Sequence, residues 1–325
     1  MELDKEKILK AGKITKEVRN YAKTIVKKGV PLLEIAEKIE EKILELGGKP
    51  AFPTTFSINE ITAHCTPSHD DKTLAHGLIK VDFGVHIDGY IADNSFSVDL
   101  DGLEENRKLI MASEKALINA IKLVEDKFAG GKNVNDKPDF NKGSSIKTAS
   151  GWAGGNNLIS TDEIGSTIQE TIESYGFSPI INLCGHSMRQ YELHAGITIP
   201  NINDGRGILL KEGLYAIEPF ATKGSGKIRD GRPSEIYELK ETKKPRSNLA
   251  RETLAFIESE YNTLPFCSRW IIKSLGHNAQ LALRELESNG NLHHFNQLVE
   301  VSGNKVSQAE HTILIEKDKV TVTTI

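Results

Sequence analysis

Two aspartates in the stretch Leu78–Leu100 are the residues best placed to do chemistry. The pair Asp88-Gly89 separates two runs of alternating character, a pattern typical of a β-hairpin with a type I′ turn. With these two residues as the loop, strand parity puts Asp82 and Asp93 on one face, as diagonal neighbours about 7–8 Å apart at the backbone. Two like charges on an otherwise apolar face repel each other unless a cation lies between them. The hairpin therefore predicts a metal site.

The alternative is that both aspartates are solvated on the exposed face of the hairpin. Their small cross-strand neighbours favour the metal site, because Ser95 pairs with Asp82 and Gly84 with Asp93. A glycine opposite Asp93 leaves room for a carboxylate that bridges two ions.

Three later residues complete a candidate ligand set. His186 follows a predicted strand over residues 178–184, Glu218 lies in a predicted strand over 213–220, and Glu310 opens the last hairpin. Taken singly, a glutamate at a strand end is usually a solvated charge. Together, four carboxylates and one imidazole suit two divalent first-row metals. Two such ions about 3.5–4 Å apart can share an activated hydroxide and polarise a carbonyl.

The elements that must position these side chains can be read from the hydrophobic periodicity. Helices are predicted over residues 3–28, 31–46, 104–126, 161–176 and 248–290, and strands over 78–87, 90–100, 178–184, 213–220 and the two arms of a C-terminal hairpin. Residues 127–160 are rich in glycine and asparagine and are predicted to be a flexible insertion. Helix pairs and hairpins recur in both halves of the 325 residues, which fits one domain with internal pseudo-symmetry.

Composition narrows the class of protein. The net charge of −4 gives no basic footprint for nucleic acid, and no apolar run is long enough to span a bilayer. Three scattered cysteines argue against a disulfide framework. We therefore expect a cytoplasmic protein that requires no nucleic acid and no membrane.

Several motifs resemble those of methionine aminopeptidases of type 2, the archaeal and eukaryotic kind, in metallopeptidase family M24. The resemblance covers nearly the whole chain except residues 127–160. The motifs are NEITAHCTP, KVDFGVHIDGYIAD, LCGHSM, LHAGITIPN, YAIEPFAT and QAEHTILI. The family's fold is the α+β "pita-bread" fold shared with prolidases and creatinase, with pseudo-two-fold halves. The resemblance implies that residues 1–325 form one catalytic domain, and that about 248–290 are the helical subdomain inserted in type 2.

The resemblance also implies roles for individual residues. The metal ligands would be Asp82, Asp93, His186, Glu218 and Glu310. Among them, Asp93 and Glu310 would bridge the ions, and Glu218 would also shuttle a proton. The histidines near the scissile peptide would be His64 and His194, and the methionine side chain would lie against Phe52, Leu193 and Phe295.

The activity implied is removal of initiator methionine from nascent polypeptides, with hydrolysis by a hydroxide that bridges two metal ions. Cobalt, manganese, iron(II) and zinc all suit these ligands. The family further implies a monomer, and the ribosome is a candidate partner.

Some residues depart from the family pattern, and two other functions stay open. Phe295 stands where tyrosine is common and Ala309 where phenylalanine is common, which predicts a wider or softer methionine pocket. An Xaa-Pro peptidase would use similar ligands. A metal-free relative acting as a ribosome-associated or regulatory binding module is the non-enzymatic alternative, although such relatives lose ligands and here all five candidates are present.

Overall fold

The computed structural model describes residues 3–129 and 158–325. The helices are α1 Lys5–Ile25, α2 Leu32–Glu45, α3 Glu104–Ala129, α4 Thr161–Ser174, α5 Asn248–Tyr261, α6 Ser268–Leu275 and α7 Ala279–Ser288. The strands of the first half are β1 Lys49–Pro50, β2 Thr55–Ile58, β3 Ile61–Ala63, β4 Leu78–Ile87 and β5 Tyr90–Asp99. Those that follow are β6 Ser178–Pro179, β7 Cys184–Met188, β8 Thr198–Pro200, β9 Gly213–Ile217, β10 Phe220–Thr222, β11 Ile228–Leu239, β12 Phe266–Cys267, β13 Leu292–Glu300, β14 Val306–Gln308, β15 His311–Glu316 and β16 Lys319–Val322.

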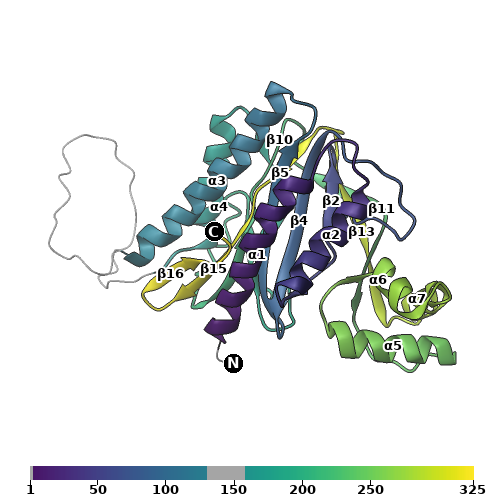
Figure 1. The fold of residues 1–325 in the computed structure, drawn as a ribbon. Helices are drawn as coiled ribbons and strands as arrows, with labels where there is room; N and C mark the ends of the chain where they lie inside the picture. Colours follow the sequence, from purple (N-terminus) through teal and green to yellow (C-terminus); the bar gives the residue numbers. More distant parts are fainter. Residues whose placement is uncertain (1–2, 130–157) are drawn as a thin grey trace, which may run out of the picture.

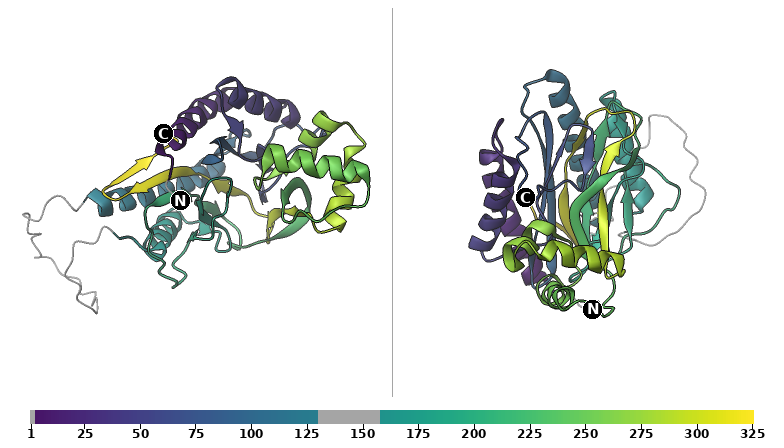
Figure 2. Two further views of the ribbon diagram at one scale, coloured as in Figure 1. Left: turned by 90° about the horizontal axis from the view of Figure 1, so that it is seen from below. Right: turned by 90° about the vertical axis from the view of Figure 1, so that its right-hand side faces the viewer.

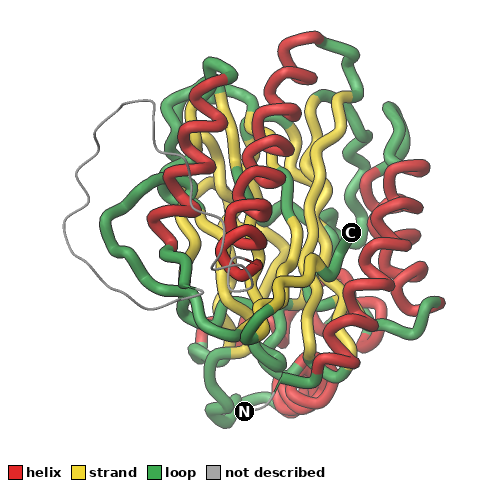
Figure 3. Tube along the Cα trace, turned by 90° about the vertical axis from the view of Figure 1, so that its left-hand side faces the viewer, coloured by secondary structure: helices red, strands yellow, loops and turns green. Residues whose placement is uncertain are grey.

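A pair of helices packed on an antiparallel sheet occurs twice, as the predicted pseudo-symmetry requires. In the first half, α1 and α2 cover a sheet in which β4 pairs with β1, β2 and β5. In the second half, α3 and α4 lie against a sheet of order β16-β15-β9-β7-β8. The two helix pairs lie next to each other along the strands (Figures 1 and 3), and residues of α1 and α3 line a hollow between these two helices.

The central hairpin has the predicted register. Asp82 is the partner of Ser95 and Gly84 is the partner of Asp93. The turn residues Asp88 and Gly89 have φ of 48° and 84°, the left-handed conformation that a type I′ turn needs at both positions. Both aspartates therefore point to one face of the sheet.

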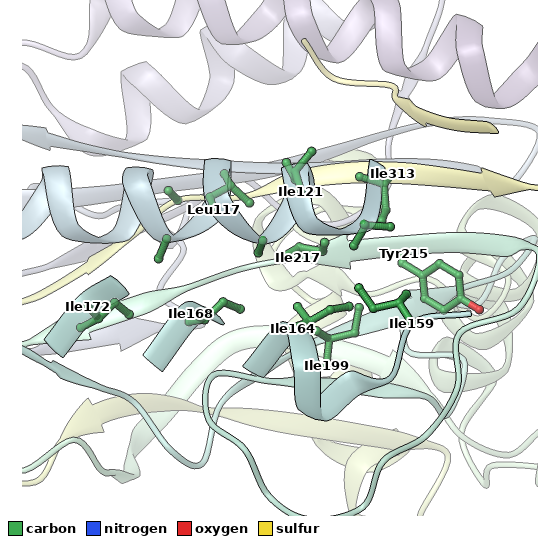
Figure 4. Close-up of a cluster of buried hydrophobic side chains, with 14 of the residues drawn as sticks. Leu117, Ile121, Ile159, Ile164, Ile168, Ile172, Ile199, Tyr215, Ile217 and Ile313 are labelled. Atoms are coloured by element: carbon green, nitrogen blue, oxygen red, sulfur yellow. The ribbon is translucent and has the colours of Figure 1, made fainter. Parts of the chain in front are cut away.

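Each helix pair buries an apolar stripe against its own sheet. Val18 of α1 and Ile35 and Ile39 of α2 pack against Val81 and Phe83 of the hairpin, and all five side chains are fully buried. The second core is seen in Figure 4, where Leu117 and Ile121 of α3 face Ile164, Ile168 and Ile172 of α4, with strand residues Ile217 and Ile313 beside them. The helix starts are fixed locally. Asp4 caps α1, and Ser160 and Glu163 form a capping box at α4.

Helices α5, α6 and α7 form a group of their own at one end of the molecule (Figures 1 and 2). They fill most of the region 248–290 that was predicted to be helical. Their apolar faces meet in a separate core that includes Leu254, Ile257, Leu283 and Leu286. This group is attached to the sheet β12-β11-β13-β3 through β11, β12 and β13, and the edge strand β3 leads directly to His64.

Three sequence predictions differ from the structure in their boundaries. Helix α3 continues to Ala129, because Phe128 is buried in the core between α3 and α4. Residues 158–160 also belong to the fold, while the rest of the predicted insertion, 130–157, lies outside the described residues. The predicted strand 178–184 is in fact two elements, β6 and β7, which pair in different sheets.

The predicted strand 213–220 is also divided. It becomes β9 and β10, and Glu218 and Pro219 lie between them. Proline has no N–H to donate to a ladder, and the two strands pair in different sheets. No helix of the described residues is long and apolar enough to cross a membrane.

Gly12 provides a test of how α1 packs on the C-terminal segment. A Cβ at this position would lie 2.2 Å from the backbone oxygen of Thr323, so the helix can approach this segment only without a side chain. We expect Gly12→Ala to lower the free energy of unfolding by about 1–3 kcal/mol, although alanine is favoured in helices by about 0.8–1 kcal/mol. Urea unfolding measures the change. The exposed neighbour Lys13→Ala is the control and should shift stability by less than about 0.5 kcal/mol.

Candidate metal centre

All ten residues that the sequence singled out line one cavity of about 360 Å³. They are Phe52, His64, Asp82, Asp93, His186, Leu193, His194, Glu218, Phe295 and Glu310. They come from both halves of the molecule and from the loops between strands. The convergence that the sequence required of them is therefore present, while the role of each stays a prediction.

The acidic and imidazole groups sit on neighbouring strands or at strand ends. Asp82 and Asp93 belong to the hairpin β4–β5, and His186 lies inside β7 rather than after a strand as predicted. Glu218 directly follows β9, and Glu310 directly precedes β15. Because β15 pairs with β9 through His311 and Ile217, the two glutamates leave the sheet side by side.

Direct hydrogen bonds join the two halves at this point. The Thr312 hydroxyl accepts from the Asp93 N–H at 2.7 Å and donates to the Asp93 carbonyl at 2.8 Å. The Glu310 N–H donates to the Ser95 carbonyl at 3.0 Å. These bonds fix the backbones of Asp93 and Glu310 relative to each other, so their carboxylates are held in place before any ion binds.

Three side chains can reach a common ion. One ligand atom each from Asp93, His186 and Glu310 lies within 4.8 Å of the other two. The His186 Nε2 atom is 3.6 Å from Asp93 Oδ2 and 3.7 Å from Glu218 Oε1. These separations are longer than hydrogen bonds, and they suit ligands that surround a cation rather than contact one another.

Burial makes the four carboxyl groups electrostatically costly. It raises the pKa of Asp82 to about 7. The pKa values of Asp93, Glu218 and Glu310 are also raised, first by burial and then by the neighbouring carboxylates. Burial also lowers the pKa of His186 to about 3, so its imidazole is neutral and able to ligate a metal.

Unpartnered buried atoms show that the cluster fits a cation. Asp82 Oδ1, Asp93 Oδ1 and Glu310 Oε1 are buried without a hydrogen-bond partner. Buried polar atoms nearly always have a partner, and a divalent cation would supply one to each of these oxygens. Hard oxygen donors with one imidazole match the preferences of first-row divalent metals.

Gln308 is a member of the site that the sequence analysis missed. Its Nε2 amide lies 3.5 Å from Asp82 Oδ2, 3.3 Å from Glu218 Oε2 and 3.5 Å from Glu310 Oε2. It therefore points a donor at three of the four carboxylates. Its position two residues before Glu310 in the motif QAEHTILI could have indicated this role. It was not selected because an amide side chain is an uncommon metal ligand.

Gly84 makes room for a pocket wall rather than for a carboxylate. A Cβ at Gly84 would lie 2.6 Å from Cε1 of Phe52 and 3.0 Å from the Cβ of Ala51. The Phe52 ring thus occupies the space beside Gly84, while the bridging role predicted for Asp93 stays a prediction. This packing holds the aromatic wall directly against the hairpin that carries the acidic side chains.

The two histidines outside the ligand set flank the cavity. The His64 ring packs edge-on against Phe295, with centroids 5.3 Å apart, and the rings of His186 and His194 are 4.6 Å apart. Burial lowers the pKa of His64 to about 4, so it is neutral near pH 7. Its Nδ1 lies 3.3 Å from the carbonyl of Asn296. An Nδ1–H donated there leaves Nε2 as an acceptor.

Ala309 does not line the cavity, although it was predicted to alter a pocket there. Its side chain is buried in the core that contains Leu117 and Ile313, and it borders a separate hollow between α1 and α3. Adjacent residues of an extended chain point to opposite sides, so Gln308 and Glu310 face the cavity while Ala309 faces away. Phe295, the other departure from the family pattern, does line the cavity.

Comparison with known proteins agrees with this geometry. The sequence model of Metallopeptidase family M24 matches residues 6–136. A methionine aminopeptidase of Pyrococcus horikoshii is 42% identical over 327 residues, covering 99% of this chain and 100% of its own. Among solved structures, a thermophilic Arx1 has a TM-score of 0.76 at 17% identity, covering 99% of this chain and 91% of its own. The methionine aminopeptidase of Thermotoga maritima has a TM-score of 0.62 at 21% identity, with 98% and 95% covered.

The fold and the buried acidic cluster define a metal-dependent peptidase with the pita-bread fold. The chain belongs to metallopeptidase family M24, within which its full-length relatives are methionine aminopeptidases. Similarity to the solved structures, at or below 21% identity, supports the fold alone.

The raised pKa values predict an unusual pH dependence for metal-free protein. A carboxyl group whose folded-state pKa is raised stabilises the fold fully below its unfolded pKa of about 4. That contribution is lost as pH rises through about 7, the pKa of Asp82, because the folded state binds more protons than the unfolded state. We expect Tm of chelator-treated protein to fall between about pH 4.5 and 7.5. Added Mn²⁺ should reverse most of this fall.

The variant Asp82→Asn separates the contribution of Asp82 to the pH dependence of Tm from that of all other carboxyl groups. It removes one titrating group and one repulsive charge, so its Tm should fall less steeply over the same pH range than that of the wild type. Parallel curves for the two proteins would contradict this account.

Proposed function

We propose that this chain removes the N-terminal methionine of polypeptides by metal-dependent hydrolysis. The observation that carries the proposal is the composition of the cavity that the ten candidate residues share. One end holds four carboxylates and His186, and the walls include the apolar side chains of Phe52, Leu193 and Phe295. This cavity fits an apolar N-terminal residue. The side chain of that residue would lie against the apolar wall, and its amino group and first peptide bond would lie at the acidic end, where a cation can bind.

The residues that would hold metal are Asp82, Asp93, His186, Glu218 and Glu310. Five ligands, four of them able to bind through two oxygens, are enough for two divalent ions, with Asp93 and Glu310 proposed to serve both. Two such ions polarise the scissile carbonyl and lower the pKa of a water molecule towards neutrality. Which of manganese, cobalt, iron(II) or zinc is used depends on supply as much as on these ligands.

Side chains of the chain handle the proton and the peptide. We propose that Glu218, whose carboxylate lies within the acidic cluster at 3.7 Å from His186 Nε2, accepts a proton from the attacking water and passes it to the leaving amine. Neutral His64 would accept a hydrogen bond from the scissile amide through Nε2. His194 would donate one to the developing oxyanion, where a fixed donor stabilises charge.

The setting follows from the substrate class. Newly made polypeptides are the main source of N-terminal methionine, so we propose that the protein acts on nascent chains in the cytoplasm. We also propose that it is a monomer of the type 2 kind. The ribosome is then the candidate partner, and co-sedimentation with ribosomes tests it. Helices α5–α7 are proposed to be the type 2 insertion.

A pair of peptides tests the substrate class. Metal-loaded protein should release methionine from a Met-Gly or Met-Ala peptide and leave an Ala-Pro peptide intact, because the long methionine side chain would contact the apolar wall and the short methyl group of alanine would not. Released amino acids are quantified by mass spectrometry after loading with Mn²⁺, Co²⁺ or Fe²⁺. No methionine release with any of these ions would sink the proposal, and preferential cleavage of Ala-Pro would replace it with an Xaa-Pro peptidase.

Asp93→Asn separates function from folding. The change removes the proposed bridging carboxylate, so turnover should be lost. It also removes a buried carboxyl group whose charged form is disfavoured, so at a pH where this group is ionised the metal-free variant should be more stable than the wild type, by roughly 1–3 kcal/mol. Urea unfolding and methionine release measure the two effects on the same samples. A variant with wild-type turnover would refute the bridging role, and Asp93→Ala should likewise be inactive.

A further inference from the structure

A buried ion pair links two helices beside the cavity without lining it. Glu40 of α2 and Arg269 of α6 form two parallel hydrogen bonds, Nη1 to Oε2 at 2.7 Å and Nη2 to Oε1 at 2.9 Å. Their side chains are 9% and 3% exposed. This two-pronged geometry fixes both the separation and the relative orientation of the charged groups.

Both partners also bind chain segments outside the helices. The Glu40 carboxylate accepts from the Thr54 N–H at 3.3 Å and from the Trp270 indole Nε1–H at 2.8 Å. Arg269 donates its Nε–H to the Pro67 carbonyl at 3.2 Å. The pair thus holds one point on each of two segments, residues 52–56 and 64–67.

Those two segments carry walls of the cavity. Phe52 and Thr55 lie in the first and His64 begins the second, and all three line the cavity. The segments are tied to each other as well, because the Thr66 hydroxyl donates to the Thr54 carbonyl at 2.8 Å and the Phe56 N–H to the Cys65 carbonyl at 2.6 Å. His64 itself has a φ of 59°, a conformation that needs support from its surroundings.

We propose that the Glu40–Arg269 pair is a positioning unit for substrate: through Thr54 and Pro67 it sets the places of Phe52 and His64 in the cavity. The proposal rests on the proposed function, since it assigns these two residues to the peptide. A purely structural tie between α2 and α6 would not need charges, because apolar side chains of similar volume hold buried surfaces together at least as well. Apolar side chains would leave the Thr54 N–H and the Pro67 carbonyl without these partners.

The test compares three variants of the full-length, metal-loaded protein. Glu40→Gln weakens the pair while keeping its shape, and the double variant Glu40→Leu/Arg269→Met replaces it with apolar groups. The matched control is Glu37→Gln/Lys273→Met, which removes an exposed contact of 3.8 Å between the same two helices. Steady-state kinetics on a Met-Ala peptide and calorimetric titration with Mn²⁺ are measured for each.

We expect the first two variants to lose about 10- to 100-fold in kcat/KM, mainly through a higher KM, as small displacements of positioning residues do. Their Mn²⁺ affinity should stay at the wild-type value, because none of the five proposed ligands touches the pair. The control should stay within about twofold of wild type in kcat/KM, in KM and in Mn²⁺ affinity. A folded double variant with wild-type KM would overturn the proposal, and this variant decides the matter if Glu40→Gln does not fold.

Hydrogen exchange keeps this proposal distinct from the proposed function. Amides of residues 52–56 and 64–67 should exchange faster in the first two variants than in wild type and control, while those of residues 78–99 should not change. That result would stand even if the wild-type protein released no methionine, in which case the substrate assignment alone would fail. Unchanged exchange in the two segments would refute the positioning role.

Discussion

The main constraint on this structure is that four carboxyl groups, which repel one another, are buried together. Burial and the neighbouring carboxylates outweigh the positive charge of Arg19, which is the smallest of the influences on the pKa of Glu310, and Gln308 supplies only an amide donor. The fold therefore holds Asp82, Asp93, Glu218 and Glu310 at a cost that a divalent cation offsets. Stability and metal binding are thus linked, and the site is preformed because the hydrogen bonds of Thr312 and Glu310 to the hairpin backbone fix it.

The two-fold arrangement explains how one chain assembles such a site. A hairpin can present two carboxylates on one face, but not the four carboxylates and one imidazole that line this cavity. Repeating the unit of helix pair and sheet brings a second set of strand ends, with His186, Glu218 and Glu310, against the first. The helix pairs then pack against the joined strands and bury their apolar side chains.

The sequence predicted the parts of this structure that depend on local rules. The hairpin register followed from Asp88-Gly89 and strand parity, and the helix positions from apolar periodicity. Strand limits were less accurate at residues 178–184 and 213–220, because the chain passes between sheets there and only tertiary pairing decides where each strand ends. Ala309 was misplaced for a similar reason: a departure from a family pattern gives no direction for a side chain. Gln308 and the Glu40–Arg269 pair were missed because their roles lie in contacts distant in sequence.

The division of labour in the cavity also explains why specificity can change without loss of chemistry. The acidic groups lie on paired strands or directly at their ends, where cross-strand bonds hold the backbone. The apolar wall and His64 lie on segments outside the ligand strands, and these segments are held by Glu40, Arg269 and the helical group α5–α7. Substitutions in that helical group can therefore move the wall relative to a fixed acidic cluster. In such a construction, side chains far from the proposed metal ligands influence which substrate can bind next to the acidic cluster.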